Sequence, residues 1–245
     1  MNWLNTAFPW IGLAGAIVLL FLLFATDTLR SDRGVSRWRD LTWLSWAGAT
    51  AYLLHNVEEY GIDLLGQTYA FPTLFCGMFG FHALYPTCPV PPQVFTAVNV
   101  PMFWLAAPVA ALMSKRHPVV GLTIYSVISV NMVTHIVQGV ASGTFYNPGF
   151  LTAVVLFLPL TAWMIRAMFV TGPLSYTTLA YLVGWGIALH LILMAAMLPL
   201  IKGLLHDALP STVAQVGNAA LLIVAPWLFE RWRGRAVFHP SAGAG

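Results

Sequence analysis

Seven apolar runs divide the chain, and each is long enough to cross a lipid bilayer as a helix. They cover residues 7–26, 41–62, 93–113, 119–140, 150–169, 176–200 and 212–229. A spanning helix needs about 20 mainly apolar residues. The runs do not alternate apolar and polar positions as barrel strands do, and lipid does not tolerate unpaired backbone. The pattern therefore predicts an all-α polytopic membrane protein with about seven transmembrane helices.

An eighth apolar stretch, residues 68–85, is interrupted by proline and glycine and does not predict a span. We expect an interfacial or re-entrant segment here, with His82 at the membrane interface, followed by a stiff proline-rich connector at 86–92. We found no internal repeat or low-complexity tract. The chain is therefore predicted to form one transmembrane domain over residues 1–237, with a short flexible tail at 238–245.

Composition supports a membrane protein and excludes an ordinary soluble domain. Hydrophobic residues make up 59% of the chain and charged residues 8%, whereas a soluble domain has about 25% charged residues. The formal net charge is +3. That positive charge is spread over short loops, as membrane orientation requires, so we expect no nucleic-acid partner.

The lysines and arginines predict the orientation of the chain. With seven spans, every one of them except Lys202 falls on one side of the membrane: Arg30, Arg33, Arg37, Arg39, Lys115, Arg116, Arg166, Arg231, Arg233 and Arg235. Cytoplasmic loops are enriched in lysine and arginine. We therefore expect the N-terminus outside and the C-terminus in the cytoplasm, in a bacterial inner (plasma) membrane. The chain has two cysteines, Cys76 and Cys88, and the sequence leaves open whether they pair.

Titratable side chains inside the predicted spans are the unusual feature of this chain. His55, Glu58 and Glu59 lie in the second run, His135 in the fourth and His190 in the sixth. Such groups are costly at membrane depth and each is a functional hypothesis by default. These three runs cross in the same direction, and their histidines stand at similar depths. We therefore expect the imidazoles at one level in the outer half of the bilayer.

Helical spacing places these groups on shared faces. His55 and Glu59 are four residues apart, about 40° around a helix, and Glu58 lies on the other side of His55. Asn131 and His135 have the same four-residue spacing. These faces are expected to point into the bundle. Further amides occur at similar depth in the third and seventh runs, at Asn99 and Asn218.

Imidazoles and carboxylates in one dry pocket are typical metal ligands. We expect His55, His135, His190 and Glu59 to bind a divalent metal, with zinc as the first choice and iron as the second. In this hypothesis Glu58 or Glu59 acts as general base on a metal-bound water, and Asn131 stabilises developing negative charge. Spacing leaves open which glutamate is ligand and which is base. The alternative is that these groups hydrogen-bond one another and orient the bundle.

The segment His55-Asn56-Val57-Glu58-Glu59 has the pattern H-x-x-E-E. Together with His135, His190 and the turn at 147–149, in an all-helical membrane chain, it resembles the HXXEE-domain family over most of residues 40–195. The resemblance implies a metal-dependent membrane enzyme, because that family is suggested to use its histidines and glutamates in this way. It implies no particular substrate, since the family is functionally uncharacterised.

Three functions are compatible with these residues. The first, which we prefer, is a metal-dependent, hydrolase-type enzyme acting on a lipophilic small molecule taken from the bilayer. The second is a metal-free acid–base isomerase or cyclase of an isoprenoid or sterol-like lipid, using a protonated glutamate. The third is a proton- or cation-coupled transporter, against which the absence of an inverted repeat argues. The sequence leaves the oligomeric state open.

Overall fold

The computed structural model describes residues 2–81 and 85–239. His82 and residues 240–245 of the predicted tail lie outside the described residues. The described part of the chain is built from helices and contains no strand. The prediction of an all-α membrane protein is therefore confirmed.

Six helical segments within the described residues are long and apolar enough to cross a membrane. They are α1 (Trp3–Ala25); α4 (Pro92–Asn99), η3 (Val100–Ala106) and α5 (Ala107–Met113); α6 (Pro118–Leu122) and α7 (Ile124–Ala141); α8 (Phe150–Thr152), η4 (Ala153–Phe157), α9 (Leu158–Ile165) and η5 (Arg166–Val170); α10 (Tyr176–Ile201); and α11 (Leu209–Arg233) with η6 (Gly234–Val237). Five of them match a predicted apolar run to within four residues at each end, and the last extends eight residues beyond the predicted end at 229.

The remaining predicted span is α2 (Leu41–Asn56), which continues without a break as the π-helix η2 (Val57–Gly61). It is not among the six candidates, because the polar side chains in its second half lower its hydropathy. This helix is also almost completely buried. The structure therefore supports six spans by length and composition. His55, Glu58 and Glu59 of the predicted site lie on a further helix, inside the bundle.

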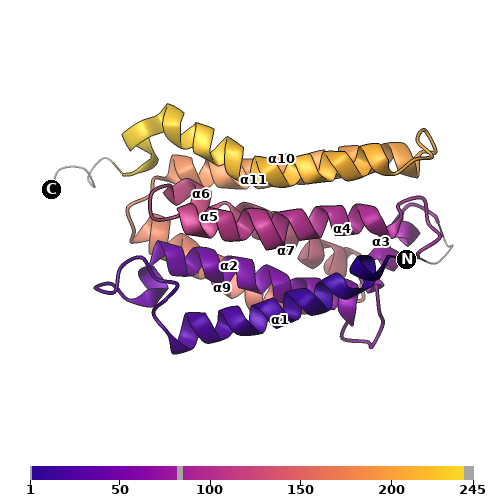
Figure 1. The fold of residues 1–245 in the computed structure, drawn as a ribbon, viewed down its shortest axis with the longest axis horizontal. Coiled ribbons are helices and arrows are strands. Elements are labelled where there is room, and N and C mark those ends of the chain that lie inside the picture. The colour runs from indigo at the N-terminus through magenta and orange to yellow at the C-terminus, as the bar shows by residue number, and fades with distance from the viewer. Residues whose placement is uncertain (1, 82–84, 240–245) are drawn as a thin grey trace.

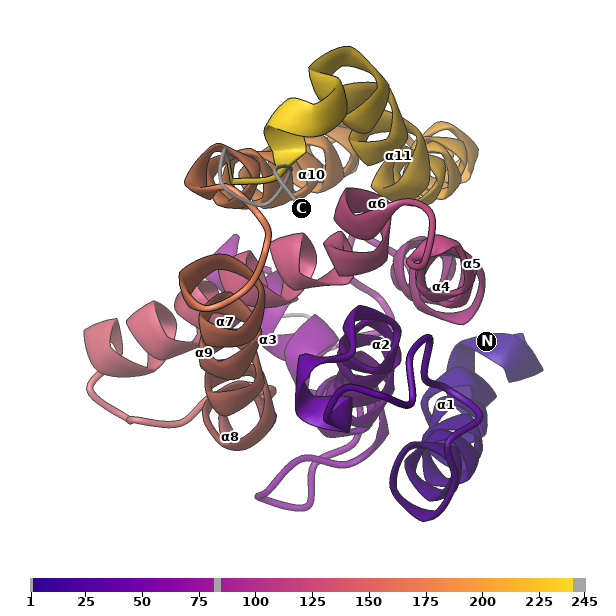
Figure 2. The ribbon, with the colours of Figure 1, turned by 90° about the vertical axis from the view of Figure 1, so that its left-hand side faces the viewer.

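The helices run roughly along one axis. Figure 1 shows α3 and the start of α4 at the end where the N-terminus lies, and the loop between α1 and α2 at the opposite end. Figure 2 looks along the bundle and shows α10 and α11 together on one side, with α2 lying between α1 and the α8–α9 segment. The short 3₁₀ helix η1 (Arg37–Arg39) precedes α2.

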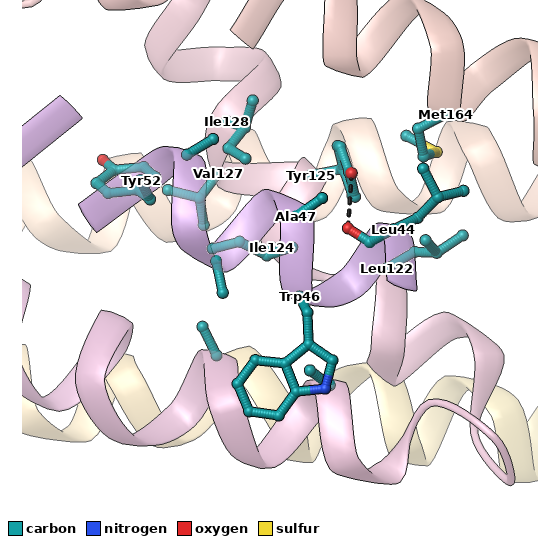
Figure 3. Packing of buried hydrophobic residues seen from close by; sticks show 14 of the residues in the cluster. Leu44, Trp46, Ala47, Tyr52, Leu122, Ile124, Tyr125, Val127, Ile128 and Met164 are labelled. Atoms are coloured by element: carbon teal, nitrogen blue, oxygen red, sulfur yellow. Dashed lines mark hydrogen bonds between the residues drawn. The ribbon is translucent and has the colours of Figure 1, made fainter. Parts of the chain in front are cut away.

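Close packing around the first half of α2 fixes its position. A Cβ atom on Gly48 would lie 2.8 Å from Cγ2 of Ile124 on α7, so only glycine allows this approach. The Tyr125 hydroxyl donates to the carbonyl of Leu44 at 2.8 Å (Figure 3). Lipid tails are as apolar as the side chains, so the hydrophobic effect does not drive helices together within a bilayer. Close packing of the backbones and hydrogen bonds between helices hold them together instead. These contacts hold α2 against α7, which is where the candidate site forms.

The broken stretch at 68–85 contains the nine-residue helix α3 (Ala70–Met78), which is too short to span a bilayer. Its Cys76 forms a disulfide with Cys88, in the segment before α4. This answers the question of pairing that the sequence left open. The disulfide ties α3 to the start of α4, and Phe75 of α3 packs on Phe95 of α4.

Candidate metal centre

Three buried side chains meet where α2, η2 and α7 come together. Oε1 of Glu59 lies 3.3 Å from Nε2 of His55 and 3.2 Å from Nε2 of His135. One ligand atom from each residue falls within 4.8 Å of the others. His55 is 0% exposed, and Glu59 and His135 are each 3% exposed. We call His55, Glu59 and His135 the triad.

Local helix geometry builds the triad. His55 stands near the end of α2, and Glu59 lies four residues later in the π-helix, so the two side chains share a face. Short π-helical segments are frequent at functional sites because they change the direction of side chains within a helix. α7 packs against α2 and brings His135 to the same carboxylate oxygen.

The other nitrogen of His135 is held by a single asparagine in the loop after α7. Asn147 Nδ2 donates to the backbone carbonyl of His135 at 2.9 Å, which fixes the orientation of its amide. Its Oδ1 therefore faces Nδ1 of His135 at 2.6 Å. An amide oxygen only accepts, so Nδ1 carries a proton, and in the neutral imidazole Nε2 presents a lone pair to the triad.

His55 is oriented through a chain of two further residues. Its Nδ1 lies 2.7 Å from Oγ1 of Thr152, and that hydroxyl donates to Oε2 of Glu58 at 2.6 Å. Because the hydroxyl proton goes to the carboxylate, Nδ1 of His55 is the donor to Oγ1. In the neutral imidazole, Nε2 of His55 then also directs a lone pair at Glu59.

Glu58 anchors this chain at the start of α8. Its carboxylate accepts from the backbone N–H of Leu151 at 3.0 Å and of Thr152 at 2.8 Å. Anionic groups are favoured at helix N-termini, where N–H groups are unpaired. Tyr146 also donates to Glu58, at 3.4 Å, and burial raises the pKa of the Tyr146 hydroxyl, which keeps its proton.

Gly149 allows the loop between α7 and α8 to lie directly on the two imidazoles. Its φ is +98°, and a Cβ atom there would stand 2.5 Å from Cε1 of His135 and 2.8 Å from Cε1 of His55. Only glycine fits both the left-handed backbone and this approach. The loop is thus a wall of the site.

The triad gathers three acceptors around one point. Two imidazole lone pairs face a carboxylate oxygen, and such an arrangement needs a shared proton or a cation to be stable in a buried place. Two imidazoles and a carboxylate are the ligands of catalytic zinc in several hydrolases and of non-haem iron(II). Ligating histidines ordinarily donate their second nitrogen to a carboxylate, carbonyl or similar group, and both histidines here donate to a fixed oxygen.

A cavity of about 270 Å³ adjoins the triad. Glu59 and His135 form part of its wall, and most of the remainder is apolar, from α3, α4, η3 and α10. Asn131 and His190 also line it. A group bound in this cavity would thus be in direct reach of two members of the triad.

The structure brings together three of the four predicted metal ligands. His190 lies on the cavity but is not in the triad, because its Nδ1 donates to the carbonyl of Gly186 one turn back on α10, at 2.8 Å. Glu58 is likewise outside it, since its carboxylate is engaged at the start of α8. Asn131 lies on the cavity wall, and its Nδ2 donates to the Tyr52 hydroxyl at 3.1 Å.

Sequence reasoning missed the residues that orient the triad: Asn147, Gly149 and Thr152. The turn at 147–149 entered the sequence analysis only as part of the family resemblance, without a role in the site. The available signal was the position of this turn, immediately after the span that carries His135. Thr152 left no signal, because its contact with His55 joins residues 97 positions apart.

The comparison with protein families gives one match. Residues 46–164 match the family described as proteins of unknown function with an HXXEE motif. Over this segment, the chain is similar to the HXXEE family. The histidine and the second glutamate of the motif are His55 and Glu59 of the triad, and the first glutamate is Glu58. The matched segment also contains His135, Asn147 and Thr152. The comparisons with curated proteins and with solved structures gave no match.

Proposed function

We propose that this protein is a membrane-embedded, metal-dependent enzyme of hydrolase type that acts on a lipophilic substrate. His55, Glu59 and His135 hold one divalent cation, with zinc preferred and iron(II) as the second choice. The observation that carries this proposal is the convergence of two lone-pair nitrogens and a carboxylate oxygen within 4.8 Å, in a fully buried place.

The ligand number favours a catalytic over a structural site. Structural zinc is closed by four protein ligands, whereas catalytic zinc has three and leaves a position open for water or substrate. Two of the three triad residues also line the cavity, so the open position would be reached from there. A cation in such a site activates water and polarises an electrophilic group of the substrate.

Glu58 and His190 have different roles in this proposal from those expected from the sequence. Glu58 acts as a positioning residue through Thr152 and His55, and Glu59 acts as a ligand. His190, whose Nδ1 proton is given to its own helix, has Nε2 left to take a proton from a group in the cavity. Asn131 lies on the same wall, and the second hydrogen of its Nδ2, which the Tyr52 hydroxyl does not take, would stabilise developing negative charge.

A packed aromatic layer favours an enzyme over a transporter. Tyr52 stands one turn before His55 on α2, and its ring stacks on Phe103 with centroids 3.5 Å apart. Phe157 packs against both Tyr52 and His55. These rings pack on one another between α2, η3 and η4 beside the triad, so a through-path for ions there would have to displace them.

For the topology, we propose that the helix of α2 and η2 is a seventh span, with the N-terminus outside and the C-terminus in the cytoplasm of a bacterial inner membrane. α2 has 16 residues and η2 has five, which at 1.5 Å per residue give roughly the 30 Å of a bilayer core. The Cys76–Cys88 disulfide supports this orientation, because disulfides persist in oxidising compartments.

A lipid-turnover assay tests the proposed function. Protein in nanodiscs is stripped of metal, reloaded with zinc or iron(II), and incubated with a total lipid extract that is followed by mass spectrometry. We expect metal-dependent conversion of a lipid, which the Glu59→Gln variant loses and the Asp207→Asn variant, changed at an exposed loop carboxylate, retains. Equal conversion by stripped protein, or by Glu59→Gln, would contradict the proposal.

A further inference from the structure

The cavity beside the triad has a polar side and a larger apolar side. Aromatic and methionine side chains from α3, α4 and α10 form the apolar side, among them Phe75, Phe95, Met194 and Met197. Glu59 and His135 of the triad, together with Asn131 and His190, form the polar side. A ligand that fits both parts has an apolar body and one compact polar end.

We propose that the cavity binds a single-chain lipid whose polar end carries a hydroxyl group, and that this lipid enters sideways from the bilayer between α3 and α7. The proposal deepens the proposed function by naming its substrate class, and it rests on that function only for the reaction that follows binding.

The volume of the cavity limits the ligand to a single acyl chain. Its volume is about 270 Å³, just below the range of roughly 300–1,000 Å³ that is usual for ligand sites. Two acyl chains with a phosphate head group do not fit such a space. One chain does, with its far end extending through the mouth of the cavity into the bilayer.

The polar side of the cavity offers acceptors. His190 uses its Nδ1 proton on the Gly186 carbonyl, so its Nε2 accepts. The Oδ1 atoms of Asn131 and Asn218 have no hydrogen-bond partner among the described residues. The Asn218 amide is fixed by donation from its Nδ2 to the Leu189 carbonyl at 3.1 Å. A polar end that donates hydrogen bonds is recognised here, and one that only accepts is disfavoured.

The mouth of the cavity opens on a surface suited to lipid. Met78 of α3 and Thr134 and Gln138 of α7 line the cavity; Met78 and Thr134 are exposed and Gln138 is half-buried. Gln138 Nε2 lies 3.3 Å from the Met78 sulfur across the opening. Beside them on α7, Val133 and Val137 are 51% and 60% exposed. Large apolar side chains exposed around an opening, in the middle of an apolar helix, indicate that the opening faces acyl chains.

Photo-crosslinking in nanodiscs tests this proposal. The probe is dodecanol with a diazirine on its chain, and the crosslinked residues are mapped by mass spectrometry. We expect crosslinks at Phe75 and Met194 inside the cavity. An excess of unlabelled dodecanol removes them, whereas its methyl ether, which cannot donate a hydrogen bond, leaves most of them.

Two tryptophan variants test the route. Thr134→Trp fills the mouth and should lower cavity crosslinking at least five-fold, while Val133→Trp, on the neighbouring lipid-facing position, should leave it unchanged. Thermal unfolding of both variants checks that they are folded. Equal competition by the methyl ether, or equal crosslinking of both variants, would overturn the proposal.

A third variant separates this proposal from the proposed function. His135→Asn removes a triad ligand but leaves the apolar wall intact, so it should lose bound metal and keep the crosslinks. Crosslinking with no metal bound to the wild type would refute the metal centre alone. Metal binding without cavity crosslinks would refute the lipid site alone.

Discussion

Replacing Gly149 by alanine tests whether the loop between α7 and α8 shapes the triad. The new Cβ atom would stand 2.5 Å from Cε1 and 2.8 Å from Nε2 of His135, and 2.8 Å from Cε1 of His55. An ordinary contact begins at 3.4 Å, so the His135 ring, the loop or both must move by about 1 Å in total. Metal ligation requires distances within about 0.2 Å of the ideal values.

The Gly149→Ala substitution is expected to lower both the stability of the protein and its affinity for the metal. A left-handed backbone costs an alanine roughly 1–2 kcal/mol relative to glycine. Displacement of the imidazoles adds a loss of metal affinity, which we place at 10- to 100-fold, the range seen when groups that orient metal ligands are removed. Gly143 in the same loop provides the control, because its φ is +69° and a Cβ atom there would meet nothing within 4 Å.

Competition with a metal chelator measures the affinity of both variants, and thermal unfolding in detergent measures their stability. We expect Gly143→Ala to show only the backbone cost and wild-type metal affinity, and Gly149→Ala to show the backbone cost and weakened metal binding. Equal zinc affinity of the two variants would refute the inference that Gly149 is needed for the loop to lie against the imidazoles of the triad.

Three further changes have defined outcomes. Asn147→Ala removes the acceptor that fixes an imidazole, so zinc affinity in the same chelator assay should fall roughly 10- to 100-fold; an unchanged affinity would exclude this role. Replacing Cys76 and Cys88 together by serine opens a cross-link between residues 12 positions apart, and should cost about 2–3 kcal/mol, seen as a lower melting temperature; an equal melting temperature would contradict it. Gly186→Ala places a Cβ atom 2.0 Å from a backbone oxygen of α7 and should destabilise the bundle by about 1–3 kcal/mol, whereas Gly184→Ala, with open space around it, should be near neutral; similar melting temperatures for the two would refute the close packing.

Hydropathy predicted the helices well because the bilayer leaves few alternatives. The apolar run at 150–169 corresponds to helix Phe150–Val170, and the run at 176–200 to Tyr176–Ile201. The ends of the helix that carries His55 were predicted equally well. This helix has a lower hydropathy than the six candidate spans because it contains buried polar residues.

Spacing along one helix predicted part of the site, and contacts between helices lay beyond it. The pair His55 and Glu59 follows from a four-residue spacing, and similar depth predicted that His135 lies near them, as it does in the structure. Similar depth also suggested His190. Depth does not tell how a helix is rotated about its axis or which contact a side chain makes, and His190 donates to the Gly186 carbonyl of its own helix. Glu58 was placed beside Glu59 by sequence, while its hydrogen bonds are to residues 88 to 94 positions later.

X-ray absorption spectroscopy of the purified protein, after loading with zinc, tests the central claim most directly. The account predicts about one zinc per chain, with nitrogen and oxygen ligands at about 2.0–2.1 Å and an outer-shell signal of two imidazoles that is lost in the His135→Asn variant. A protein that binds no zinc or iron after loading, or a bound metal whose spectrum is unchanged in His135→Asn, would contradict it.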